Sequence, residues 1–224
     1  RRATADTVET PAPRPTRVVI ADLAGEITQA VQSHAARDVL LVAPKRFLGD
    51  LLAAPGRDFL GMSINWRVFG SGGLASYADA PVHQQFTVAI KRKLYLNSGL
   101  KSLFHHPRWF QRMREHGPVR LDLAKARRET QADWGGGPLV WINPAGKVID
   151  GWTPDGPYLQ VLPIRDIDHS VAQMNHYMLR SAETFSLKQG SLSPTAGKDR
   201  YTRRYWSNAD RRDEFDDSAA RYAD

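Results

Sequence analysis

Apolar and polar residues alternate over residues 62–68, about a quarter of the way along the chain. Met62, Ile64, Trp66 and Val68 are apolar, and the residues between them are polar. A period of two predicts a β-strand. Four small residues, Gly70-Ser71-Gly72-Gly73, follow it, and glycine lets a ligand approach the backbone closely. Because open α/β sheets often bind ligands where a strand ends, this loop is a candidate ligand site. The alternative is a core strand followed by an ordinary turn.

Apolar runs alternate with helical spacing before this strand. Residues 17–23 and 38–43 are predicted as short buried strands, and residues 24–36 and 47–54 as helices. The order strand, helix, strand, helix, strand is typical of an α/β layer with parallel strands. The expected fold class is therefore α/β, with helices flanking a sheet.

The elements after the glycine loop are shorter. Residues 81–90 and 100–104 are predicted as strands, and residues 108–115 as a brief basic helix. Turns rich in glycine and proline then predict loop-dominated structure, anchored by Trp134, Trp141 and Trp152. Residues 171–188 are expected to contain a helix that begins with a cap at Ser181.

Composition changes along the chain suggest three parts. Residues 1–16 contain three prolines and no apolar periodicity, which predicts a linker or disordered arm of a longer protein. Residues 17–190 are expected to form the α/β domain. Residues 191–224 form a charged, aromatic-rich tail, expected to be either an exposed helix or an arm that docks on a partner.

The composition excludes several classes of protein. The chain has no cysteine, so disulfides, thiolate catalysis and cysteine-bound metals are excluded. No apolar run approaches the roughly 20 residues that span a bilayer, and no signal-peptide core is visible. The expected location is the cytoplasm, with attachment to a membrane surface left open.

The net charge of +7 is the remaining compositional signal. A basic surface can meet nucleic acid, anionic lipid or a phosphorylated ligand. Acidic residues are interleaved with the arginines and no nucleic-acid motif accompanies them. A solvated surface of mixed charge, without a nucleic-acid partner, is therefore expected.

Six segments, in order, resemble bacterial family 2-like glycosyltransferases of the GT-A fold. The family phrases W-R-x-F-G-x-x-G, V-x-E-x-F-T, K-x-L-F, H-x-P, N-x-x-G and x-N-H-Y-x-x-R-S-x-E-x-F-x-x-K are matched by residues 66–73, 82–87, 101–104, 116–118, 143–146 and 174–188. The resemblance covers more than half of the chain. It implies a GT-A-like mixed sheet, a truncated or modified Rossmann-like arrangement, with a loop-rich C-terminal half.

Such enzymes transfer a sugar from a nucleotide diphosphate to an acceptor hydroxyl. A divalent cation held by an Asp-x-Asp motif offsets the charge on the diphosphate, and a carboxylate removes the acceptor proton. By resemblance, the ligand-binding candidates are Trp66, Arg67, Gly70, Ser71, Gly72, Lys101, His176, Arg180 and Lys188.

The chain departs from the family where the chemistry is most demanding. Ala43, Lys45 and Arg46 stand where the family has its metal-binding acidic motif, and Gln84 replaces a further acidic residue. Lysine and arginine offer no lone pair to a metal near neutral pH. The part of the chain before Ala43 is also short for a complete nucleotide-binding half. No catalytic residue is assigned, and no metal is expected.

These departures favour a degenerate glycosyltransferase-like domain that does not catalyse transfer. It would bind glycan or nucleotide sugar and assist a neighbouring catalytic glycosyltransferase domain in polysaccharide or glycan assembly. The alternative is an active, sugar-nucleotide-dependent glycosyltransferase. It would use Mn²⁺ or Mg²⁺ with its nucleotide sugar, or would neutralise the diphosphate with Lys45 and Arg46 instead of a metal.

Overall fold

A mixed five-stranded sheet is the centre of the computed structural model, which describes residues 18–20, 51–130, 139–192, 197 and 199–219. Its strands run in the order β1 (Val18–Ile20), β8 (Ala172–His176), β2 (Gly61–Val68) and β4 (Leu100–Phe104), and β7 (Trp141–Ile142) also pairs with β2. The pairs β1–β8, β8–β2 and β7–β2 are parallel, whereas β2–β4 is antiparallel. The expected α/β class with a mixed sheet is confirmed.

The central strand β2 is buried on both of its faces. Met62 and Ile64 pack in a cluster with Leu51, Phe59 and Ile142. The polar side chains of the opposite face are buried too, because hydrogen bonds replace water. Trp141 Nε1 donates to Ser63 Oγ at 2.9 Å, and Asn65 Nδ2 donates to backbone carbonyls of residues 97–99. The predicted alternation is therefore present, but its polar half contributes to the core.

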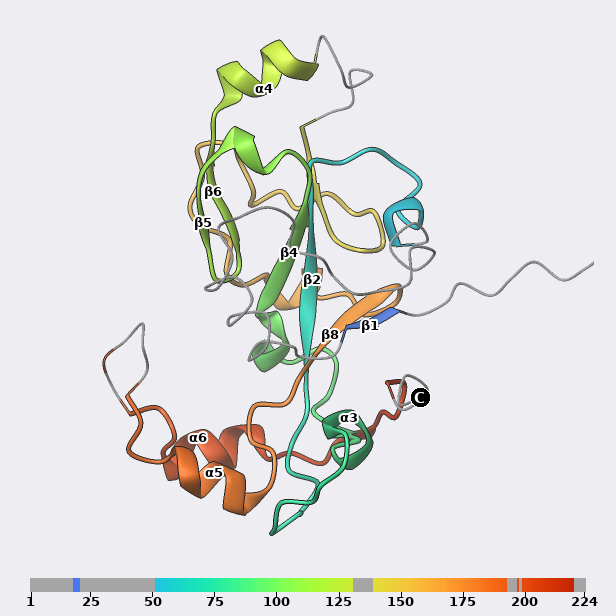
Figure 1. Cartoon of the computed structure of the whole chain (residues 1–224). Helices are drawn as coiled ribbons and strands as arrows, with labels where there is room; N and C mark the ends of the chain where they lie inside the picture. The colour runs from blue at the N-terminus through green and yellow to red at the C-terminus, as the bar shows by residue number, and fades with distance from the viewer. Residues whose placement is uncertain (1–17, 21–50, 131–138, 193–196, 198, 220–224) are drawn as a thin grey trace, which may run out of the picture.

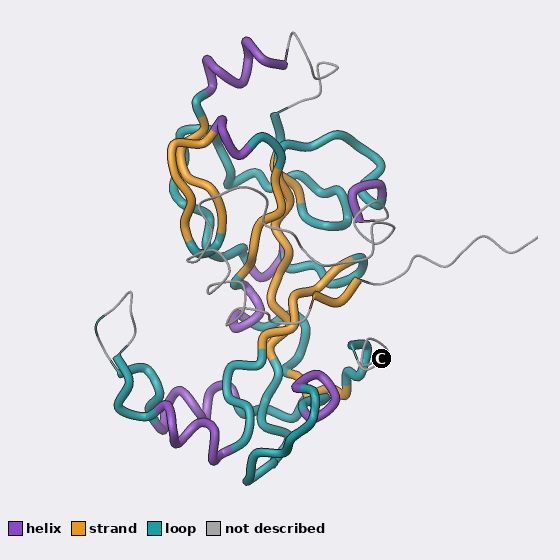
Figure 2. Tube along the Cα trace, viewed as in Figure 1, coloured by secondary structure: helices purple, strands orange, loops and turns teal. Residues whose placement is uncertain are grey.

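A second hydrophobic cluster lies under the loop-rich part of the chain. Trp141 is 2% exposed in this cluster and stacks on Trp152 at 5.1 Å between ring centroids. The expected anchoring by these two residues is confirmed, whereas Trp134 lies outside the described residues. Figure 2 shows how much of this part is loop rather than helix or strand.

The prediction of a helix over residues 108–115 is wrong. The segment contains a 3-10 turn, η2 (Pro107–Trp109), and a strand, β5 (Phe110–Arg114), which pairs with β6 (Gly117–Leu121). Trp109, Phe110 and Met113 have helical spacing, but a two-residue connection at Glu115-His116 allows Phe110 to pair with Leu121 in the core. Cross-strand pairing therefore outweighs local spacing.

The prediction of one strand over residues 81–90 is also wrong. Residues Val82–Gln85 form the short helix α3, and only Val88–Ala89 form a strand, β3. Pro81 has a φ of −54°, which suits the start of a helix, and its carbonyl accepts hydrogen bonds from the amides of Gln84 and Gln85. β3 pairs with β9 (Glu214–Phe215), so the C-terminal segment returns to the sheet region.

Helices α3, α4 (Leu123–Thr130), α5 (Ala182–Lys188) and α6 (Arg203–Ala209) lie beyond the ends of the central strands rather than over their faces (Figure 1). α4 lies at one end, and α3, α5 and α6 lie at the other. The cap of α5 is confirmed, since Ser181 Oγ accepts a hydrogen bond from the Thr184 amide at 3.2 Å. The tail, expected to be an exposed helix or a docking arm, contains the short helix α6, which packs against Phe185 of α5 and is followed by the return to β3.

The predictions before β2 are tested only in part. The strand predicted within residues 17–23 is observed as β1, and residues 51–53 of the predicted helix 47–54 are helical. Residues 24–36 and 38–43 lie outside the described residues.

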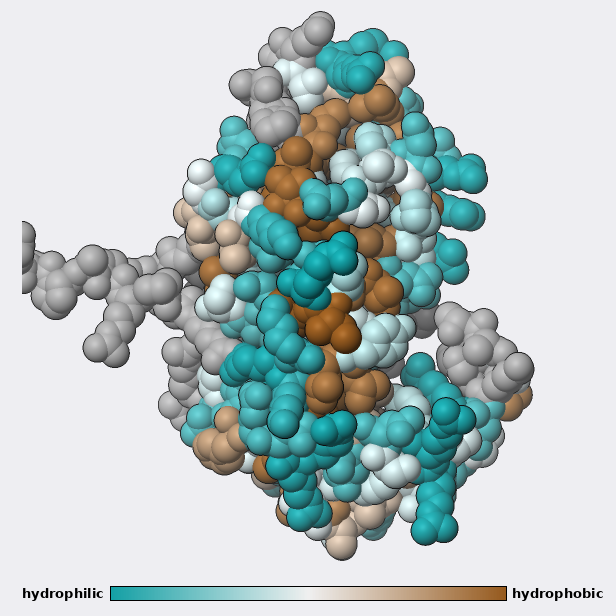
Figure 3. Space-filling view, turned by 180° about the vertical axis from the view of Figure 1, so that it is seen from behind, coloured by the Kyte–Doolittle hydropathy of each residue, from teal (hydrophilic) through white to brown (hydrophobic). Residues whose placement is uncertain are grey.

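None of the helices in the described ranges has the length and apolarity to cross a membrane. Figure 3 shows a band of hydrophobic residues along one side of the molecule, bordered by hydrophilic residues.

Candidate functional site

The structure brings three of the candidate ligand-binding residues together. Trp66 and Lys101 share one face of the sheet because Lys101 lies opposite Ile64 in the β2–β4 pair. His176, at the end of β8, lies opposite Val68, and its ring centroid is 4.2 Å from that of Trp66. All three side chains are partly exposed.

Two residues that were not candidates complete this group. His116, in the β5–β6 connection, has its ring centroid 5.6 Å from that of Trp66. Tyr158, from the loop-rich segment, has its ring centroid 6.1 Å from that of His116. We call Trp66, Lys101, His116, Tyr158 and His176 the Trp66 cluster. His116 belonged to a family-like H-x-P match that marked its segment, whereas no pattern marked Tyr158.

A hydrogen bond of the His116 ring determines which of its two nitrogens can accept a hydrogen bond. Its Nδ1 lies 2.8 Å from the carbonyl oxygen of Leu100, so Nδ1 carries the proton in this contact. Burial lowers the pKa of His116; the Leu100 carbonyl raises it, and the charge of Lys101 lowers it further. The imidazole is therefore neutral at pH 7, and its Nε2 can accept a hydrogen bond.

Tyr158 retains a donor beside this acceptor. Burial raises the pKa of the Tyr158 phenol, and the hydrogen bond donated by the His116 amide to its oxygen lowers it by less. The guanidinium of Arg114 lies 4.8 Å above the Tyr158 ring. The phenol thus keeps its proton at pH 7. The Trp66 cluster presents an indole, an imidazole acceptor, a phenol donor and an ammonium group.

The glycine loop is occupied by the chain's own C-terminal segment. The amide and Oγ of Ser71 donate to Asp210 Oδ1 at 2.8 and 2.7 Å. A Cβ on Gly70 would lie 2.8 Å from the Arg211 carbonyl oxygen, and one on Gly73 would lie 2.5 Å from the Arg212 guanidinium. The glycines therefore permit close approach, but the group that approaches is residues 210–212. Gly72, with a φ of +62°, makes the turn.

Arg67 is fully buried and bonded within the chain. Its Nε donates to Asp216 at 3.0 Å, its Nη2 donates to Glu214 at 2.8 Å, and its Nη1 donates to the Ile90 carbonyl. Arg92 shares both carboxylates, at 3.3 Å from Asp216 and 3.6 Å from Glu214. We call these four charged residues the carboxylate clasp. It attaches the C-terminal segment to β2, on the face opposite Trp66.

The clasp changes the acidity of Asp216. Burial alone raises the pKa of this carboxyl, but hydrogen bonds from Ser218, Arg67 and Gln173 outweigh burial and lower the pKa to about 2. Asp216 is therefore ionised throughout the physiological pH range, and its negative charge compensates the positive charge of Arg67.

The other candidate residues lie away from the Trp66 cluster or outside the description. Arg180 is exposed with a φ of +60°, and Lys188 Nζ lies 5.7 Å above the Tyr201 ring. Gln84 is exposed in α3. Ala43, Lys45 and Arg46 lie outside the described residues. Within the described ranges, no group of three or more His, Asp or Glu residues is placed to hold a metal ion.

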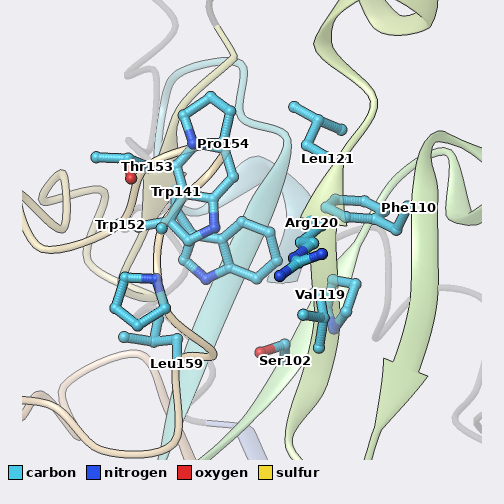
Figure 4. Close-up of a pocket in the computed structure, with 13 residues that line it drawn as sticks. Ser102, Phe110, Val119, Arg120, Leu121, Trp141, Trp152, Thr153, Pro154 and Leu159 are labelled. Atoms are coloured by element: carbon cyan, nitrogen blue, oxygen red, sulfur yellow. The ribbon is translucent and has the colours of Figure 1, made fainter.

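Two hollows accompany these groups. Figure 4 shows the first, where Trp141 and Trp152 face β6; at about 10 Å³ it has room for about one water molecule. The second is an open hollow of about 330 Å³ lined by Arg92, Lys93 and residues 167–170. Arg92 already bonds Gln173 and Asp216, and Lys93 bonds the Ile167 carbonyl. The Trp66 cluster remains the candidate site with several polar groups around an aromatic ring.

Comparison of the chain with models of protein families, with curated proteins and with solved structures found no match.

Proposed function

We propose that this chain is a glycosyltransferase-like domain that binds a glycan at the Trp66 cluster and does not catalyse sugar transfer. In this role it assists a larger glycosyltransferase in polysaccharide or glycan assembly. The observation that carries the proposal is the partly exposed Trp66 ring, with His176 at 4.2 Å and His116 at 5.6 Å between ring centroids.

A sugar ring has chemistry that complements this group. Its C–H groups form an apolar face that can pack on an indole, and its hydroxyls need donors and acceptors at the rim. His116 Nε2 supplies an acceptor, and the Tyr158 phenol supplies a donor. The cluster therefore supports binding of a neutral glycan. The Lys101 ammonium donates to the Glu115 carbonyl and has further N–H groups, from which a sugar hydroxyl oxygen can accept a hydrogen bond.

The sequence supports both a glycosyltransferase-like class and the absence of catalysis. Residues 66–73 and 174–188 carry the most extended family-like phrases, and both contribute to the cluster. At the acidic motif, Lys45 and Arg46 are residue types that do not bind divalent cations. The competing proposal, metal-independent transfer, rests on these same two cations neutralising a diphosphate.

Glycan binding tests the proposal directly. The 224-residue chain would be titrated calorimetrically with neutral oligosaccharides of glucose, galactose and mannose. We expect binding by at least one series, and at least a tenfold loss in Trp66→Ala, because removal of the ring removes the stacking surface. Tyr77→Ala is the matched control, since Tyr77 is 64% exposed in the 74–81 loop. Equal losses in both variants, or no binding by the unchanged protein, would reject the glycan site.

Nucleotide titration separates the two classes of function. The chain would be titrated with UDP and GDP, each with and without Mn²⁺. Absence of binding is expected for the non-catalytic domain. Metal-dependent micromolar binding would overturn that part of the proposal. Metal-independent binding that is lost in Lys45→Ala/Arg46→Ala would establish the competing proposal instead.

A further inference from the structure

We propose that the surface formed by η2 and α4 docks on an anionic membrane. Residues 107–130 contain seven Lys or Arg and three Asp or Glu, which gives a net charge of +4 out of +7 for the whole chain. More than half of the excess positive charge therefore lies in this one segment. We call Arg108, Lys125, Arg127 and Arg128 the basic surface.

The fold holds these residues on one side of the molecule. The Lys125 ammonium donates to the Arg108 carbonyl at 3.1 Å, which joins α4 to η2. Ala126 is completely buried, so α4 is fixed in rotation, and Arg127 and Arg128 are exposed. Figure 3 shows hydrophilic residues gathered at the end of the molecule where α4 lies. The positive charges are thus presented by a rigid, packed element.

The acidic residues of the segment neutralise little of this charge. Asp122 Oδ1 accepts a hydrogen bond from the Lys125 amide, and a Glu129 oxygen accepts one from Trp109 Nε1. Glu115 lies 3.8 Å from Arg114, which is outside the basic surface. Among the described residues, no carboxylate forms an ion pair with the guanidinium of Arg108, Arg127 or Arg128. These cations remain available to a partner.

The buried aromatic rings of the segment favour a membrane over a single-stranded nucleic acid. Its two aromatic rings outside histidine, Trp109 and Phe110, are buried at 1% and 9% exposure, so neither can stack on a base. A bilayer rich in anionic lipid needs no stacking and attracts clustered Lys and Arg through its headgroups.

Sedimentation with vesicles tests this proposal. The 224-residue chain would be mixed with vesicles of phosphatidylcholine alone, or of equal parts phosphatidylcholine and phosphatidylserine. We expect binding to the mixed vesicles only, and weaker binding as salt is added. In Arg108→Gln/Arg127→Gln/Arg128→Gln, the affinity should fall by about a hundredfold, at about fivefold for each arginine near the surface.

A control triple variant removes the same charge elsewhere. Arg165→Gln/Arg203→Gln/Arg204→Gln alters exposed arginines in η3 (Ile164–Asp166) and α6, and should retain vesicle binding within about threefold. Equal losses of vesicle affinity in the two triple variants would show that only the net charge of the protein matters, and would overturn the assignment of binding to the basic surface. Binding to phosphatidylcholine alone, no vesicle binding, or tighter binding to single-stranded RNA than to the mixed vesicles would each overturn it as well. Melting curves of both triples check that the fold is kept.

Discussion

Arg67 donates a hydrogen bond from Nε to Asp216 Oδ2 at 3.0 Å, across 149 residues of sequence. The Arg67 side chain has no exposed area, and that of Asp216 is 1% exposed. A buried ion pair contributes little compared with an apolar pair of the same shape, but loss of one partner is costly because the other charge stays buried. The carboxylate clasp is therefore a sensitive point of the fold.

Removal of the Asp216 carboxylate should destabilise the protein strongly. We expect Asp216→Ala to lower the free energy of unfolding by about 3 kcal/mol, measured by urea denaturation. Asp217→Asn is the matched control, because Asp217 is exposed and adjacent in sequence. Its effect should stay within about 0.5 kcal/mol. Equal effects of the two substitutions would contradict a structural role for the clasp.

Acid should weaken the same contact in a defined range of pH. The pKa of Asp216 is lowered from 3.8 to about 2 in the folded protein. A carboxyl with a lowered folded-state pKa stabilises the fold above its unfolded-state pKa, and this contribution is lost as the pH falls through the folded value. The stability difference between the unchanged protein and Asp216→Asn should therefore be constant above pH 5 and shrink between about pH 4 and pH 2. A difference that shrinks only above pH 5 would refute this assignment.

Gly99 should be intolerant of a side chain. A Cβ at this position would lie 2.3 Å from Cε3 of Trp66, which is much closer than van der Waals contact allows. We expect Gly99→Ala to cost about 1–3 kcal/mol and to change the near-ultraviolet circular dichroism as the indole turns. Gly151→Ala is the control, since nothing lies within 4 Å of its Cβ position. An unchanged dichroism spectrum in Gly99→Ala would show that Trp66 is not held in this orientation.

The cap of α5 gives a further quantitative expectation. Ser181 Oγ accepts the Thr184 amide hydrogen bond at 3.2 Å, and the residue is 1% exposed. Ser181→Ala should lower the free energy of unfolding by about 1 kcal/mol. Ser186→Ala, in the exposed part of the same helix, should change it by less than about 0.5 kcal/mol. A larger loss at Ser186 would mean that the cap does not determine the stability of α5.

Local patterns predicted some elements closely. The alternation at residues 62–68 corresponds to β2 at Gly61–Val68, and the strand predicted at residues 100–104 is β4 with the same bounds. Ser181 was recognised as a cap because the signal lies within four residues. In each case the forces that shape the element act between near neighbours in sequence, or on one buried face.

The errors arose where distant residues decide the structure. Residues 108–115 have helical spacing, yet Phe110 pairs with Leu121 in a hairpin. Arg67 was a ligand-binding candidate because residues 66–73 resemble a family phrase. Its partners, Glu214 and Asp216, lie 147 and 149 residues away, and nothing in their local sequence marks them. Tyr158 joins the Trp66 cluster for the same reason, from a loop without periodicity.

The long sequence separation within the carboxylate clasp affects how the chain folds as it is made. Ribosomes add about 5–20 residues each second, so Asp216 is synthesised roughly 7–30 s after Arg67. During that time β2 carries an arginine whose counter-charge does not yet exist, and a fully packed core around it is unfavourable. Emergence of the C-terminal segment from the ribosome is therefore the event that permits the central strand to become fully enclosed.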